Sequence, residues 1–192
     1  MIKNILKNEF IRNAFTLMMG TAFSQAIPIA IIPILTRIFT PDDFGLLALY
    51  GACVTILSVI IAGRYEITIM LPKSDKEAKI LLQASVIIIF LIATLLCIPI
   101  FLFNKEIANL LGNENIAPWL YLLPFSALLT GIYQSLTYWN NRQKKFKNIA
   151  ASRVNQSLTQ GFIQTLLGFS KMGGGLIVGQ ILGIASSVIF LL

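Results

Sequence analysis

Long stretches without any charged residue dominate this sequence. Five of them contain no Lys, Arg, Asp or Glu and cover residues 13–36, 44–63, 80–104, 115–141 and 172–192. Each is long enough to cross a bilayer, which takes a helix of about 20 apolar residues. A sixth stretch, residues 154–170, is shorter and follows directly after Arg153. Because a charge at the centre of a membrane helix costs on the order of 2.5–3.5 kcal/mol, this spacing predicts an all-α integral membrane protein with six transmembrane helices.

The boundaries of these helices follow from the apolar stretches and the turn signals between them. We place the helices at about residues 13–36, 44–63, 80–104, 117–139, 149–169 and 172–192, as one transmembrane lobe over residues 13–192. Ser74 precedes Glu77 by three residues, which is a capping-box pattern and predicts a helix start near Ser74. Residues 105–116 contain Gly112-Asn113 and indicate a short external turn.

Residues 1–12 combine apolar side chains at helical spacing with basic ones. We interpret them as a cytoplasmic interfacial segment, the alternative being the frayed start of the first helix.

Composition excludes several functional classes. Charged residues make up 12% of the chain, against about 25% in soluble domains, so a soluble helical bundle is a poor second interpretation. Histidine is absent, and Cys53 and Cys97 lie in separate apolar segments, so we expect no disulfide, metal site, cofactor or His-based catalysis. The formal charge of +7 is spread over short clusters between apolar segments, which argues against nucleic acid as a partner.

The basic residues predict the orientation, because Lys and Arg are retained on the cytoplasmic side of a membrane. If the chain crosses six times, three of the fifteen lie on one side, namely Arg37, Lys105 and Lys171. The other twelve share the opposite side: Lys3, Lys7, Arg12, Arg64, Lys73, Lys76, Lys79, Arg142, Lys144, Lys145, Lys147 and Arg153. This asymmetry predicts that both termini are cytoplasmic.

Further patterns concern the helices themselves. Pro28 and Pro33 are expected to kink the first helix. The last helix opens with Gly173-Gly174-Gly175 and continues through Gly179 to Gly183. These glycines give two consecutive small-xxx-small steps, which predict close packing of the helix on a neighbour. Aromatic rings near the two ends of the fourth helix suit anchoring at the membrane interfaces; they belong to Trp119, Tyr121, Tyr138 and Trp139. The chain stops at Leu192 within apolar sequence, which suggests the front portion of a longer protein.

Four ionisable residues near or inside the helices are candidate functional residues: Arg37, Arg64, Glu66 and Arg153. Charges at such positions are functional candidates by default. An Arg paired with a carboxylate would join two helices, whereas an unpaired Arg would bind an anionic group and Glu66 would titrate. The residues alone leave both readings open.

Three segments in order resemble one family. LTRIFTPDDFGLLALYGA, GRYEITIMLPKSDKEAKIL and YWNNRQKKFKNIAASRVNQSL are similar to successive signatures of polysaccharide biosynthesis membrane proteins. These are the O-antigen and lipopolysaccharide flippases of the multidrug/oligosaccharidyl-lipid/polysaccharide exporter superfamily. The resemblance runs from about residue 10 to residue 170.

The resemblance implies a fold of twelve to fourteen helices in two lobes around a cavity that opens alternately to each side; this chain covers the N-terminal lobe. It implies a multi-pass protein of the bacterial inner membrane. The substrate would be a polyprenyl-diphosphate-linked oligosaccharide, and other polysaccharide-assembly membrane proteins are candidate partners beside the lipid bilayer. Arg37, Arg64 and Arg153 would contact the substrate, and Glu66 would couple transport to an ion.

Three alternatives remain. A drug/cation antiporter of the same superfamily would place acidic residues inside the membrane, and the predicted spans contain none. A membrane-embedded sugar transferase or polymerase would need catalytic carboxylates in its loops. A helical remnant without transport activity is the third alternative. We expect a transporter, not an enzyme.

Overall fold

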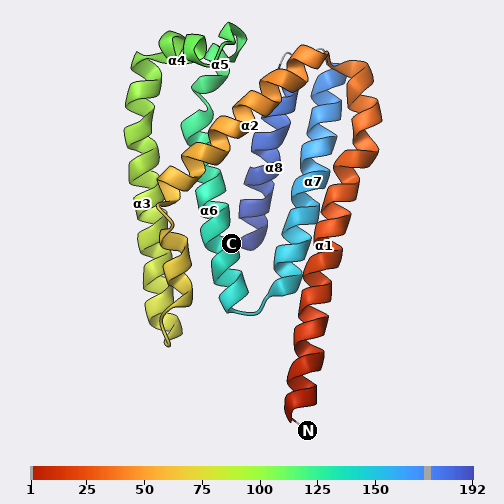
Figure 1. Cartoon of the computed structure of the whole chain (residues 1–192), viewed down its shortest axis with the longest axis vertical. Coiled ribbons are helices and arrows are strands. Elements are labelled where there is room, and N and C mark those ends of the chain that lie inside the picture. The colour runs from red at the N-terminus through yellow and green to blue at the C-terminus, as the bar shows by residue number, and fades with distance from the viewer. Residues whose placement is uncertain (1, 171–173) are drawn as a thin grey trace.

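The computed structural model describes residues 2–170 and 174–192, and long helices form most of this part of the chain (Figure 1). The long helices are α1 (Ile2–Ile38), α2 (Pro41–Ala62), α3 (Asp75–Leu102), α6 (Leu123–Arg142), α7 (Phe146–Phe169) and α8 (Gly175–Leu191). Shorter elements connect them: η1 (Tyr65–Met70), α4 (Asn104–Leu110), η2 (Glu114–Ile116) and α5 (Ala117–Leu120). The described residues contain no strand, so the all-α prediction is confirmed.

Successive long helices run in alternating directions, so their connections gather at two ends of the bundle (Figure 1). The start of α1, the α2–α3 connection and the α6–α7 turn lie toward one end, which we call the basic end. The α1–α2 turn, the segment from α4 to α5 and the start of α8 lie at the other, which we call the far end. This grouping is the one on which the predicted orientation depends.

In the part of the chain that the structure describes, three helices are long and apolar enough to cross a membrane: Ile11–Ile38, Pro41–Ala62 and Asp75–Leu102. Glu114–Leu120 and Leu123–Arg142 together make a fourth candidate, bent by 58° at the break between them. α8 has only 17 residues, and α7 carries a series of Asn, Gln, Ser and Thr side chains that lower its hydropathy. The chain is therefore a multi-pass membrane protein, whereas six crossings remain a prediction.

The helix boundaries differ from the predicted ones in two places. α1 is continuous from Ile2 to Ile38, so no break in the helix separates residues 2–12 from the predicted first span. No glycine or proline occurs before Gly20 to interrupt it. The predicted start of the last helix at residue 172, together with Lys171 and Gly173, lies outside the described residues.

The second difference is at the far end, where the predicted turn at 105–116 and the start of the predicted helix 117–139 are both wrong. α4, η2 and α5 form there instead, and α6 begins only at Leu123. Pro118 and Pro124 occupy the first turns of α5 and α6. Proline is tolerated at the start of a helix but not inside one, so two starts replace one continuous helix.

Other local predictions hold, with one exception. α3 starts after Ser74 as predicted, but no capping box with Glu77 forms; the Ser74 hydroxyl accepts a hydrogen bond from the Lys76 N–H instead, at 3.2 Å. Pro28 and Pro33 lie inside α1, which bends toward its C-terminal end (Figure 1). A full capping box forms at the start of α2, where Thr40 and Asp43 each accept a hydrogen bond from the other's backbone N–H.

Close helix contacts are built on glycines, as predicted. A Cβ atom added to Gly179 would lie 3.1 Å from the backbone O of Gln160 on α7, and one on Gly183 would lie 3.1 Å from that of Gln156. On the other side of α7, a Cβ on Gly20 of α1 would lie 2.8 Å from the Ala150 Cα. α7 is thus packed between α8 and α1, its most extensive partners.

Arg142, at the end of α6, fixes the α2–α3 connection. Its Nη1 donates to the carbonyls of Pro72 at 2.7 Å and Ile69 at 3.3 Å, and its Nε donates to Asp75 Oδ1 at 3.0 Å. The Arg142 side chain is 12% exposed, whereas that of Asp75 is 69% exposed. The two part-buried hydrogen bonds to carbonyls therefore contribute more than the exposed ion pair.

Arg142→Ala is expected to destabilise the protein by about 2 kcal/mol, because it leaves those carbonyls without their donor. Thermal unfolding in detergent, followed by circular dichroism, measures the change. Asp75→Asn is the matched control and should cost less than 1 kcal/mol, as exposed ion pairs do. Equal losses for the two variants would contradict this assignment.

Candidate functional site

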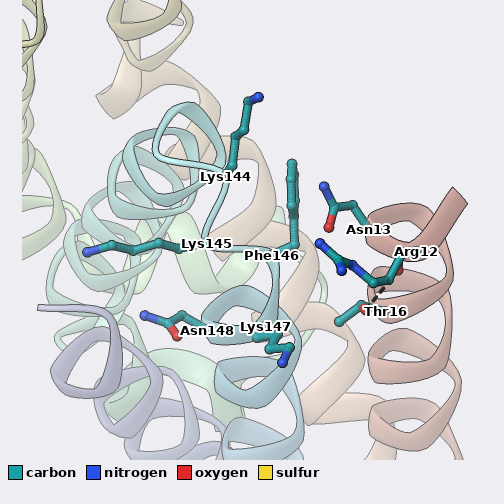
Figure 2. A pocket seen from close by; sticks show the side chains of 8 residues that line it. All are labelled: Arg12, Asn13, Thr16, Lys144, Lys145, Phe146, Lys147 and Asn148. Atoms are coloured by element: carbon teal, nitrogen blue, oxygen red, sulfur yellow. Dashed lines mark hydrogen bonds between the residues drawn. The ribbon is translucent and has the colours of Figure 1, made fainter. Parts of the chain in front are cut away.

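A basic pocket lies between the start of α1 and the α6–α7 turn (Figure 2). Its volume is about 510 Å³, within the usual range for ligand pockets. The side chains that line it are Arg12, Asn13, Thr16, Lys144, Lys145, Phe146, Lys147 and Asn148. Four of these carry positive charge and none carries negative charge. The pocket is therefore suited to an anion.

The α6–α7 turn sets the positions of the lysines. Lys144 has a left-handed backbone, with φ 55°, which reverses the chain after α6. The N–H groups of Lys144 and Lys145 donate to the carbonyls of Asn141 and Asn140, at 3.0 and 2.9 Å. The C-terminal carbonyls of α6 are thereby satisfied, and consecutive lysines project from a tight turn.

The side chains diverge from this turn (Figure 2). Arg12 and Asn13 reach from α1 toward Phe146, whereas the amino groups of Lys144 and Lys145 point outward in different directions. Lys145 also lines a neighbouring hollow of about 400 Å³ together with Lys79, Trp139 and the end of α8. Positive charge therefore extends across the basic end from the basic pocket to the C-terminal end of α8.

Arg153 lies on α7, further from the turn than the basic pocket. Its Nη1 donates to the Thr21 hydroxyl of α1 at 2.7 Å. The Thr21 hydroxyl in turn donates to the Leu17 carbonyl. Among the described residues no carboxylate lies within ion-pair distance of this guanidinium. Arg153 keeps donors for an anionic ligand.

The other predicted residues are not brought together with Arg153. Arg37 is exposed in the last turn of α1, and Arg64 is exposed beyond the end of α2. The 22 residues of α2 separate them, a length of about 33 Å at 1.5 Å per residue. The structure therefore does not support one site containing both.

Glu66 has a different environment. It is 5% exposed in η1, which packs on α6 and α3. Its Oε2 atom is buried without a hydrogen-bond partner within the described part of the chain. Burying a carboxylate oxygen without a partner is unfavourable, so Glu66 stands out among the acidic residues.

A comparison with family models gives one match. The model described as "Polysaccharide biosynthesis protein" matches residues 34–192, which is most of the chain. The chain belongs to the polysaccharide biosynthesis protein family. Searches of curated proteins and of solved structures gave no match. Family membership and the helical bundle together identify a multi-pass membrane protein with a role in polysaccharide biosynthesis.

Sequence reasoning missed the main feature of this polysaccharide biosynthesis protein. In the sequence, Lys144, Lys145 and Lys147 indicate only the orientation in the membrane, and so does Arg12. The basic cluster Lys144-Lys145-Phe146-Lys147 is the sequence signal that indicates an anion site. Its partner on α1 could not be found without knowing that α1 packs against α7.

Proposed function

We propose that this polysaccharide biosynthesis protein is a flippase that moves polyprenyl-diphosphate-linked oligosaccharide across the bacterial inner membrane, with its N-terminus and basic end in the cytoplasm. The basic pocket is the observation that carries the proposal. A lipid-linked sugar made in the cytoplasm carries its negative charge on the diphosphate. A pocket with four cations and no carboxylate offers that group a docking site at the cytoplasmic interface.

Arg153 would be the next cation for the diphosphate. It follows Phe146 by seven residues on α7, about 10 Å further along the helix. Its Thr21 contact holds the guanidinium beside α1 while most of its five donors stay free for phosphate oxygens. The diphosphate would thus pass from the pocket to Arg153 along the contact between α1 and α7.

The polyprenyl tail needs an apolar path beside the same helices. A groove of about 250 Å³ lies further along α1 and α7, bordered by α2 and α8. Apolar side chains form most of its wall, and three polar ones, Ser157, Gln160 and Gln164, come from α7. This composition fits a chain of isoprene units next to a wetted path for the head group.

Deletion of the gene in its host tests the proposal. Polyprenyl-diphosphate-linked repeat units are expected to accumulate in the cytoplasmic leaflet while surface polysaccharide is lost, because synthesis continues without transfer. Extraction and mass spectrometry of the lipid-linked units measure this. If the lipid-linked units themselves are missing or incomplete, the protein is a transferase and the proposal is wrong.

We also propose that Glu66 couples transport to a cation, since a bound cation would compensate its buried carboxylate. Glu66→Gln removes the charge with little change in shape. The rate of transport is expected to fall by about tenfold or more, which corresponds to an activation barrier higher by at least about 1.4 kcal/mol. It is also expected to become independent of sodium and proton gradients. Flipping rates measured with and without each gradient test this.

Glu77→Gln, an exposed change on α3, is the control. Glu66 has no coupling role if its variant supports normal surface-polysaccharide assembly and keeps the same response to the gradients.

A further inference from the structure

We infer that a second pocket, at the far end, binds the sugar part of the substrate. It has a volume of about 580 Å³ and lies between the start of α2, η2 and α5. Asp42, Asp43, Asn113, Asn115 and Trp119 provide its polar and aromatic lining. We call it the Trp119 pocket. The inference rests on the proposed function, because that supplies an oligosaccharide that emerges at this end.

The Trp119 ring is held in place by its neighbours in the sequence. Ile116 and Leu120 are each 0% exposed and belong to the main hydrophobic core, against which Trp119 packs while staying partly accessible. Asn104 Nδ2 donates to the Ala117 carbonyl at 2.9 Å and ties this segment to α4. Gly174 lies against the ring, so close that a Cβ there would collide with it. The aromatic surface is therefore preorganised, which an interface anchor does not require.

The polar side chains of the pocket differ in how many hydrogen bonds they already make within the protein. Asp43 accepts hydrogen bonds from the Thr40 N–H and hydroxyl at 2.9 and 2.8 Å, so it serves the helix cap. Asn113 Oδ1 accepts from the Asn115 N–H at 3.0 Å, which leaves its NH₂ group. Within residues 2–170 and 174–192, the side chains of Asp42 and Asn115 make no hydrogen bond. One carboxylate and two amides therefore remain for a ligand.

This set of groups matches a sugar. A pyranose ring presents a face of C–H groups, which packs on an aromatic ring, and a rim of hydroxyls. Each hydroxyl both donates and accepts, so it suits a carboxylate beside amides. A cation would use only acceptors, and the described residues contain no cluster of three or more acidic or thiol ligands that would hold a metal. The far end also has few basic residues, whereas the basic pocket at the opposite end has four.

The two tryptophans allow a direct test, because Trp119 and Trp139 are the only ones in the chain. In Trp139→Phe, fluorescence reports on Trp119 alone. The purified variant in nanodiscs is titrated with the soluble repeat-unit oligosaccharide released from the host's own surface polysaccharide. Saturable quenching is expected. Adding Asp42→Ala should weaken the apparent affinity about tenfold, the effect of losing one hydrogen bond to a charged group.

Two controls make the outcome decisive. Glu106→Gln lies at the same end, exposed and outside the pocket, and should leave the affinity unchanged. Trp119→Phe, which keeps Trp139, should show no quenching. The inference is overturned if Trp139→Phe gives no saturable signal, or if adding Asp42→Ala leaves the affinity for the sugar unchanged. It is also overturned if the cation choline quenches the fluorescence and the sugar does not. Since binding of a soluble sugar does not require transfer across a membrane, any of these results leaves the flippase proposal standing.

Discussion

Gly179→Leu is expected to destabilise this protein strongly. Gly179 lies where α8 crosses the backbone of α7, and a Cβ there would be 3.1 Å from both Gln160 O and Gln164 N. Backbone atoms cannot move aside as a flexible side chain does, so the two helices must separate. Helix pairs in membranes depend on such contacts, because lipid provides no hydrophobic force to hold them together.

We expect Gly179→Leu to lose about 2–4 kcal/mol, seen as a lower midpoint of thermal unfolding in detergent and a smaller monodisperse fraction. Gly45→Leu is the matched control, since nothing lies within 4 Å of a Cβ at Gly45 on α2. That change should be neutral or slightly stabilising, because leucine favours helix more than glycine does. If both variants unfold at the same temperature as the wild type, the result contradicts a close backbone contact between α7 and α8 at Gly179.

Removing the charge of the basic pocket is expected to have the largest effect on function. The variant Arg12→Ala/Lys144→Gly/Lys147→Ala removes three of its four cations. Glycine is chosen for position 144 because it accepts the left-handed φ of 55° without strain, so the turn is preserved. The apparent affinity for a polyprenyl-diphosphate sugar should fall about 100-fold, at roughly 1 kcal/mol for each lost contact.

The control for this variant is Lys73→Ala/Lys76→Ala/Lys105→Ala, which removes the same charge from exposed positions outside the pocket. It should change the affinity less than about threefold, because exposed charges are screened by salt. Equilibrium binding of a fluorescent polyprenyl-diphosphate sugar to protein in nanodiscs measures both. Equal losses in the two variants would mean that net charge, and not the pocket, attracts the substrate.

The sequence predicts the helical membrane character well, because long uncharged stretches between charged turns have few other solutions. It also predicts the glycine contacts of α8, since Gly179 and Gly183 recur on one helix face. It fails at residues 105–122, where Gly112-Asn113 indicates a turn and the uncharged stretch that follows indicates one continuous span. The prolines at 118 and 124 hold the information, but only the packing decides whether proline kinks a helix, as in α1, or starts a new one.

The candidate site is less accessible to sequence reasoning. Arg37, Arg64 and Arg153 are candidates because they lie beside apolar stretches. Of these three, Arg153 lies on α7, whose first residues line the basic pocket. Arg12 and Lys147 line the same pocket because α1 packs along α7. That contact depends on small residues such as Gly20 and Gly161, which face the neighbouring helix. Charge clustering indicates the end of the bundle, whereas the pocket itself is a product of helix packing.

Transfer of a labelled polyprenyl-diphosphate oligosaccharide in proteoliposomes tests the central claim most directly. The native gene product is reconstituted with the labelled lipid, and the fraction exposed outside is followed with a membrane-impermeant reagent. We predict that the wild type and the Lys73/Lys76/Lys105 control transfer the lipid, and that the Arg12/Lys144/Lys147 variant does so at least about tenfold more slowly. Transfer by the pocket variant at the wild-type rate, or no transfer by the wild type beyond that of empty liposomes, would contradict the account.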